Sequence, residues 1–93
     1  MPQKLKDKPL TGDKKDSGGS ELHFLVLFND DIHTFNFVIE SLIEICNHSS
    51  VQAEQCAIIA HLKGKCEIKK GIRIDLEPMH SAFNKKGLIT EID

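Results

Sequence analysis

The feature that most constrains this chain is a change of hydrophobic period across Asn29-Asp30-Asp31. In the run LHFLVLF, residues 22–28, apolar side chains alternate onto one face of a strand, and the other face is partly apolar as well. After the triplet, the apolar residues of FNFVIESLIEIC recur at helical spacing, which predicts a helix over 35–47 with Thr34 as its N-cap. A strand and an amphipathic helix therefore meet across a turn that carries two carboxylates and an amide.

Two further elements are expected in the middle of the chain. Ser49 and Gln52 have the spacing of a capping box, which predicts a second helix that ends near Gly64. A short strand, CEIKK, then ends at Gly71.

The last helix is expected from about Leu76, with Pro78 near its start and Gly87 as its C-terminal stop. The segment LITEID, residues 88–93, alternates as an edge strand. The resulting order βααβαβ predicts an α+β fold in which a small three-stranded antiparallel sheet packs against three helices on one side.

The first part of the chain differs in composition from the rest. Residues 1–21 are rich in Lys, Asp, Gly, Pro and Ser and contain few sizeable apolar side chains. They cannot bury enough surface to offset the entropy lost on ordering. We therefore expect a disordered N-terminal arm over 1–21 and one folded domain, a monomer, over 22–93.

Composition argues against several classes of function. The net charge is -2 and Phe is the only aromatic type, which argues against nucleic-acid binding. No apolar stretch approaches the roughly 18 residues of a membrane span, so we expect a cytoplasmic protein without membrane contact. Cys46, Cys56 and Cys66 form no C-x-x-C pair, which predicts buried free thiols rather than disulfides or a metal site. No motif indicates a cofactor.

The candidate site residues are the triplet at 29–31 and His61, which lies in the last turns of the second helix. Asn and Asp favour turns because their side chains bond the nearby backbone, and this alone accounts for part of the triplet. A lone helical histidine is usually structural. His23, His48 and His80 have no partner spacing and are expected at the surface.

Taken together, NDDIHTFNFVIESL and AEQCAIIAHLKGK, with its His-x-x-Gly-Lys ending, resemble the adaptor proteins of the Clp protease, the ClpS family. The resemblance is close over residues 22–65 and looser over the last helix and strand. It implies a non-enzymatic adaptor that binds N-degron substrates with a large hydrophobic or aromatic first residue. It further implies delivery to the N-terminal domain of a Clp AAA+ unfoldase, which the N-terminal arm would contact.

The resemblance also implies which residues form the site. An α-ammonium has three N–H donors, so its site needs about three acceptors, and such charge-assisted bonds are strong. By resemblance these acceptors are Asn29, Asp31 and the neutral imidazole of His61, while Asp30 adds negative potential and shapes the turn. The hydrophobic pocket for the first side chain would be lined by Leu27, His33, Phe35, Val38, Ala57, Ala60 and Leu88.

The chain departs from the family pattern at several of these positions. Many members have Thr-Pro-Met where this chain has His33-Thr34-Phe35, and larger apolar residues where it has Ala57 and Ala60. The resemblance therefore predicts binding of the α-amine more strongly than it predicts which first side chain is preferred. The segment 66–78 is shorter and differently charged than in those members, so the unfoldase-docking residues are not assigned.

Two other classes of function remain open. A hydrolase would combine Cys56, His61 and Asp31, but Cys56 lies on an Ala-rich helix face without oxyanion donors. A protein-interaction domain could share the fold without an amine site, because a fold alone does not fix function. A thiol-directed probe tests the first alternative, and blocking the α-amine of a peptide tests the second.

Overall fold

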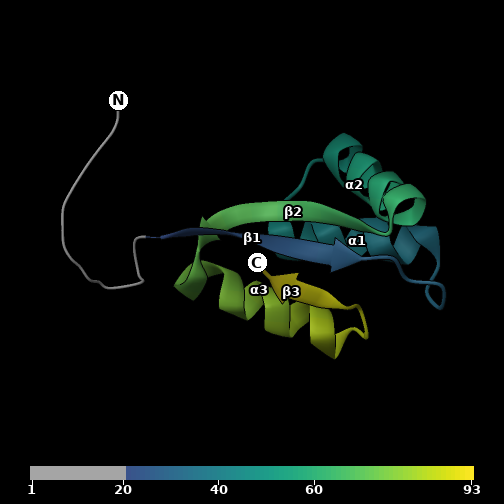
Figure 1. Cartoon of the computed structure of the whole chain (residues 1–93). Helices are drawn as coiled ribbons and strands as arrows, with labels where there is room; N and C mark the ends of the chain where they lie inside the picture. The colour runs from purple at the N-terminus through teal and green to yellow at the C-terminus, as the bar shows by residue number, and fades with distance from the viewer. Residues whose placement is uncertain (1–20) are drawn as a thin grey trace, which may run out of the picture.

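The computed structural model describes residues 21–93, which fold in the order βααβαβ (Figure 1). The elements are β1 (Leu22–Phe28), α1 (Phe35–Cys46), α2 (Ser50–Lys63), β2 (Lys65–Ile72), α3 (Arg73–Lys85) and β3 (Thr90–Ile92). The predicted α+β fold and its order of elements are confirmed. The predicted arm over 1–21 lies, except for its last residue, outside the described part of the chain.

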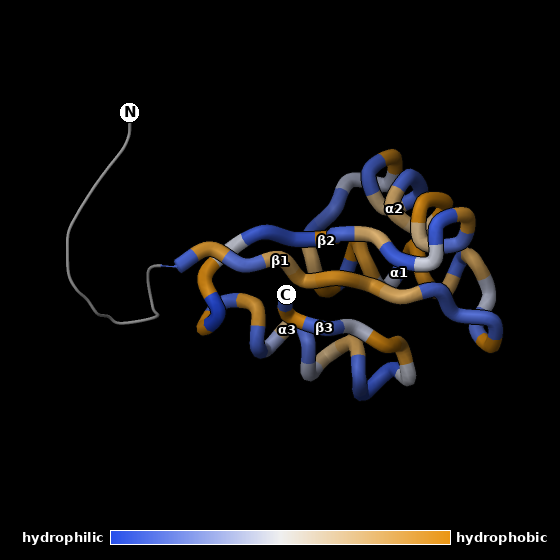
Figure 2. The backbone as a smooth tube through the Cα atoms, in the orientation of Figure 1, coloured by the Kyte–Doolittle hydropathy of each residue, from blue (hydrophilic) through white to orange (hydrophobic). Residues whose placement is uncertain are grey.

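The sheet has the strand order β2-β1-β3, and both pairings are antiparallel. Figure 2 shows the apolar β1 between the more polar β2 and β3. Leu25 and Leu27 of β1 are fully buried and belong to a core to which α1, α2 and α3 all contribute. The central strand is therefore the most apolar one, and β3 lies at an edge as predicted.

Polar side chains set the helix starts that the sequence indicated. Thr34 Oγ1 accepts a hydrogen bond from Phe37 N at 3.0 Å, and Ser49 Oγ accepts one from Gln52 N at 3.1 Å. At its C-terminus, α2 ends on Gly64, whose φ of 92° lies in the left-handed region that favours glycine. The chain can therefore leave α2 and enter β2 directly.

The start of α3 differs from the prediction. The helix begins at Arg73 rather than near Leu76, so Pro78 lies inside it and not in its first turn. The residues of that first turn are exposed, and Arg73 pairs with Glu77 at 3.2 Å. Because this turn is exposed and is stabilised by a charge pair, its residues show no apolar periodicity. The sequence pattern therefore did not predict that the helix begins at Arg73.

His48 corrects another expectation, because its side chain is not at the surface. Only 5% of the residue is exposed, and its Nε2 donates a hydrogen bond to the backbone oxygen of Ile68 at 2.7 Å. This bond joins the loop between α1 and α2 to β2. His80 is also partly buried, with Nδ1 at 2.7 Å from Thr90 Oγ1.

We predict that His48→Ala lowers the free energy of unfolding by about 1 to 3 kcal/mol, because Ile68 loses a buried donor and the ring leaves a void. Urea denaturation followed by circular dichroism measures this change. The matched control is His61→Ala, which removes an exposed ring and should cost less than about 0.5 kcal/mol. Equal unfolding midpoints for the two variants would contradict a structural role for His48.

Candidate functional site

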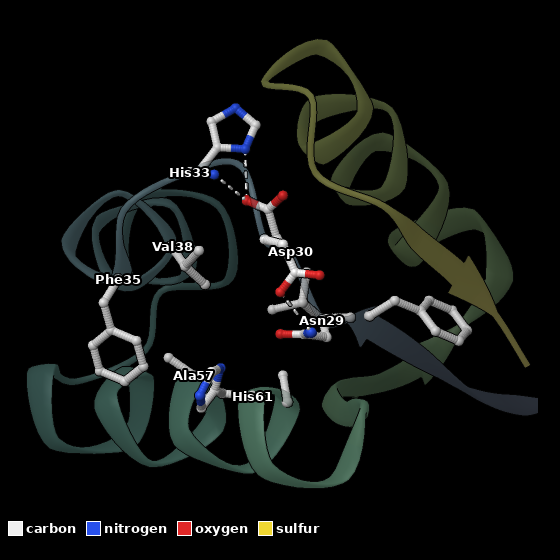
Figure 3. A pocket seen from close by; sticks show the side chains of 11 residues that line it. Asn29, Asp30, His33, Phe35, Val38, Ala57 and His61 are labelled. Atoms are coloured by element: carbon white, nitrogen blue, oxygen red, sulfur yellow. Dashed lines mark hydrogen bonds and ion pairs between the residues drawn. The ribbon is translucent and has the colours of Figure 1, made fainter.

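A cavity of about 280 Å³ lies where the end of β1 meets α1 and α2 (Figure 3). Its volume is near the lower end of small-molecule pockets in proteins, roughly 300 to 1,000 Å³. The lining residues are Leu27, Phe28, Asn29, Asp30, Asp31, His33, Phe35, Val38, Ala57, Ala60 and His61. The cavity thus has apolar walls and a polar rim.

Backbone hydrogen bonding holds the two halves of the rim together. Asn29 follows the last residue of β1, and its backbone N donates to the carbonyl oxygen of Gly64 at 2.8 Å. Gly64 ends α2, one turn after His61. Figure 3 shows His61 on α2 beside Ala57, and Asn29 at the end of β1, both at the cavity. The loop at Asn29-Asp30-Asp31, called the NDD loop below, and the end of α2 are therefore fixed relative to one another.

The acceptors on the loop are oriented by a hydrogen bond between two of its side chains. Asn29 Nδ2 donates to Asp31 Oδ1 at 3.1 Å, which leaves the Asn29 amide oxygen available as an acceptor. No donor among residues 21–93 bonds the second carboxylate oxygen of Asp31, which is exposed and can also accept. Two carboxylates and no Lys or Arg occur among the lining residues, so this rim suits a cation.

The middle carboxylate of the loop is used differently. Asp30 accepts hydrogen bonds from Ile32 N at 3.2 Å, from His33 N at 2.9 Å and from His33 Nδ1 at 2.6 Å. Its side chain is 12% exposed. Burial raises the pKa of Asp30, but the bonds from His33 and Ile32 outweigh burial and hold the pKa below its ordinary value. Asp30 therefore fixes the turn as an ionised acceptor.

The apolar walls come from short or branched side chains. Ala57 and Ala60 of α2 are buried, as are Leu27 and Val38 opposite them. Phe35 at the start of α1 lines the cavity and is 44% exposed. This arrangement leaves space between the two helices, with an aromatic ring at its edge.

The structure brings together all of the predicted site residues except Leu88. Leu88 is 1% exposed and belongs to the hydrophobic core, and it does not line this cavity. Phe28 lines the cavity but is not among the residues predicted to do so. Its place as the last apolar residue before Asn29 is the signal that could have identified it.

Residues 21–93 show no geometry that suits a hydrolase site, a reactive thiol or a metal site. Cys56, which the hydrolase alternative requires, does not line the cavity that contains His61 and Asp31. Burial raises the pKa of Cys46 to about 11 and that of Cys66 to about 12, which disfavours reactive thiolates. Within the described range, no cluster of His, Cys, Asp or Glu could hold a metal ion, and no helix is long and apolar enough to cross a membrane.

Comparison with known proteins gives a family and a fold. Residues 19–88 match the family described as ATP-dependent Clp protease adaptor protein ClpS. Among solved structures, the chain is similar to ClpS2 of Agrobacterium tumefaciens bound to L-phenylalaninamide, with a TM-score of 0.71 and 22% identity. That match covers 77% of this chain and 94% of the other, and at this identity it shows the shared fold. No curated protein matches the chain significantly.

We predict that the stabilising effect of Asp30 depends on pH. Because its pKa is lowered in the folded state, protons bind the unfolded state more tightly. The contribution is therefore complete above the ordinary value of 3.8 and is lost as the pH falls through the lower folded value. Asp30→Ala should cost about 1 to 3 kcal/mol near neutral pH, and the difference from wild type should shrink below about pH 4.

Chemical denaturation at a series of pH values measures this difference. The control is Asp31→Ala, which removes an exposed carboxylate bonded to one side chain and should cost less near neutral pH. A difference between wild type and Asp30→Ala that stays constant from neutral to acidic pH would refute this role.

Proposed function

This chain belongs to the ClpS family of Clp protease adaptor proteins, and on that premise we propose that it binds the N-terminal residue of N-degron substrates and delivers them to a Clp AAA+ unfoldase. The observation that carries the proposal is one cavity with an apolar interior and a rim of acceptors without Lys or Arg. A protein's first residue presents an ammonium next to a side chain. A site of this composition can recognise both at once.

We assign the α-ammonium to three acceptors on the rim. These are the amide oxygen of Asn29, the carboxylate of Asp31 and the neutral imidazole of His61. The bond from Asn29 Nδ2 to Asp31 Oδ1 supports this assignment, because it directs the donor group of the amide away from a ligand that has only donors. Three charge-assisted bonds satisfy the three N–H groups of the ammonium.

The first side chain would occupy the apolar interior between α1 and α2. L-phenylalaninamide, the ligand bound to the similar ClpS2 structure, combines a free α-amine with an aromatic side chain, which is the chemistry proposed for the ligand of this chain. An aromatic side chain buries about 150 to 250 Å², worth an upper bound of roughly 4 to 6 kcal/mol at 25 cal/mol per Å². Once the amine is bound, burial of apolar surface should therefore decide which first residue the site prefers.

Delivery requires a second interaction, with the N-terminal domain of the unfoldase. Family membership supports this partner, and we propose that residues 22–93 form the adaptor domain while residues 1–21 contact the unfoldase during delivery. In this arrangement the substrate site and the delivery segment are separate parts of one chain.

We predict that peptides with a free α-amine bind much more tightly than the same peptides acetylated at the α-amine. Acetylation removes the positive charge and two donors, so the rim acceptors lose their partner. Asp31→Ala and His61→Ala should each weaken binding of the free peptide by about 1 to 3 kcal/mol. Fluorescence anisotropy with a labelled peptide that begins with Phe measures both effects.

A matched control for this experiment is Asp75→Ala, which removes an exposed carboxylate from the first turn of α3, outside the cavity. It changes the net charge by the same amount as Asp31→Ala and should leave peptide affinity within about twofold. Equal affinity of the wild type for free and acetylated peptides would refute the proposed function.

We further predict that the site prefers Phe, Tyr, Trp and Leu as first residue over Ile, Val, Lys and Ala. Phe35 at the edge of the cavity should clash with β-branched ligands, whose χ1 angle has little freedom to adjust. Phe35→Ala should therefore admit Ile and Val. Ala57→Met should weaken Trp and Tyr more than Leu, through overpacking that costs about 1 to 3 kcal/mol.

A panel of peptides that differ only in the first residue tests this preference by anisotropy against the wild type and both variants. Ala53→Met is not a suitable control because Ala53 is in the core, whereas Gln52→Met changes an exposed residue of α2 and should not alter the ranking. The same ranking in all proteins would show that Phe35 and Ala57 do not select the ligand.

A further inference from the structure

We propose that His33 is a positioning residue for the amine site, holding the NDD loop in its binding geometry through Asp30. The inference rests on the proposed function, and it goes beyond that function by giving His33 a task other than contact with the ligand. Two sets of contacts carry it. One joins His33 to Asp30, and the other places the His33 ring between Phe37 of α1 and Gly87, which is remote in sequence.

The first set of contacts directs the Asp30 carboxylate toward His33. One carboxylate oxygen, Oδ2, accepts from both the backbone N and the ring Nδ1 of His33, at 2.9 Å and 2.6 Å. Figure 3 shows this carboxylate directed toward His33. Because Asp30 is ionised, Nδ1 carries the proton and donates it. The bond fixes the middle residue of the loop.

Fixing the middle residue also orients its neighbours. Asn29 and Asp31 flank Asp30 and are joined by their own hydrogen bond at 3.1 Å, on the side of the loop where the rim acceptors lie. Rotation of Asp30 into the cavity would displace both. It would also leave the backbone N–H groups of Ile32 and His33 without their acceptor.

The second set of contacts holds the His33 ring itself. It stacks on Phe37 of α1, with ring centroids 4.7 Å apart and an interplanar angle of 15°. Lys86 lies against the same phenyl ring, with Nζ 5.6 Å from the centroid, and pairs with Glu44 of α1 at 3.1 Å. The imidazole is therefore supported by α1 and by groups at the end of α3.

The turn between α3 and β3 closes the other side of the ring. Gly87 has a φ of 83°, and a Cβ built on it would lie 3.2 Å from Cε1 and 3.3 Å from Nε2 of His33. That separation is tighter than ordinary van der Waals contact. Glycine at this position thus gives the ring room to reach Asp30, and a turn remote in sequence acts on the amine site.

Three variants separate this role from a purely stabilising one. His33→Phe keeps the aromatic stack on Phe37 but removes the donor. His33→Asn loses the stack and places an amide N–H near the position of Nδ1. Gly87→Ala places a Cβ 3.2 Å from the His33 ring, so the ring must shift slightly, and it also strains the backbone at a φ of 83°, a strain that is the same in the His33→Asn background.

The measured quantity is the ratio of affinities for a free and an acetylated peptide that begin with Phe, determined by anisotropy for the full chain. We expect His33→Phe to reduce this ratio about tenfold and His33→Asn to restore most of it. Gly87→Ala should reduce the ratio in the wild type but not in His33→Asn, because Asn lacks the Cε1 and Nε2 atoms that the new methyl group would meet.

Amide exchange by NMR provides a reading that does not need a ligand. Exchange at Ile32 and His33 should accelerate in His33→Phe and return toward wild type in His33→Asn, because their N–H groups donate to Asp30. Unchanged exchange in His33→Phe, or equal loss of the affinity ratio in His33→Phe and His33→Asn, would overturn the inference. A wild type that binds both peptides equally would refute the proposed function instead, and the exchange data would then decide the role of His33 alone.

Discussion

The hydrogen bond from Asn29 N to Gly64 O is the contact on which the candidate site depends. It lies at the point where β1 ends and where α2 turns into β2, directly beside the pairing of Phe28 with Lys65. The antiparallel pairing of β1 and β2 therefore brings the NDD loop next to the last turn of α2. Gly64 makes this possible because its left-handed conformation ends the helix without a spacer before the strand.

The cavity itself results from the side chains that α2 presents to the interior. The buried residues of α2 that line the cavity are Ala57 and Ala60, and neither is large enough to fill the space next to α1. Empty apolar volume costs stability, since it forfeits packing contacts that a larger side chain would make. The small sheet offsets this cost through fully buried Leu25 and Leu27 in its central strand. A ligand side chain that fills the cavity would recover part of the lost packing.

Local chemistry in the sequence was sufficient for most of the fold. Thr34, Ser49 and Gly64 fix helix ends through side-chain or backbone preferences that act within a few residues, so their roles were predictable. The family resemblance supplied the association of the NDD loop with His61. Leu88 and His48 were misplaced because their surroundings, the core and the backbone of β2, are set by tertiary packing alone. The contact of His33 with the turn at Gly87 has no local signal either.

The two adjacent carboxylates of the NDD loop, Asp30 and Asp31, have different surroundings. Asp30 is largely buried, accepts three hydrogen bonds within the loop and has a lowered pKa, so its charge is already compensated. Asp31 is exposed and accepts one bond, from Asn29, so much of its hydrogen-bonding capacity remains unused. Two uncompensated carboxylates side by side would repel each other, and two fully compensated ones could not bind a cation. Under the proposed function, the division of these roles between neighbouring residues would let the loop stay ordered before a ligand arrives and still offer a negative acceptor to an ammonium group.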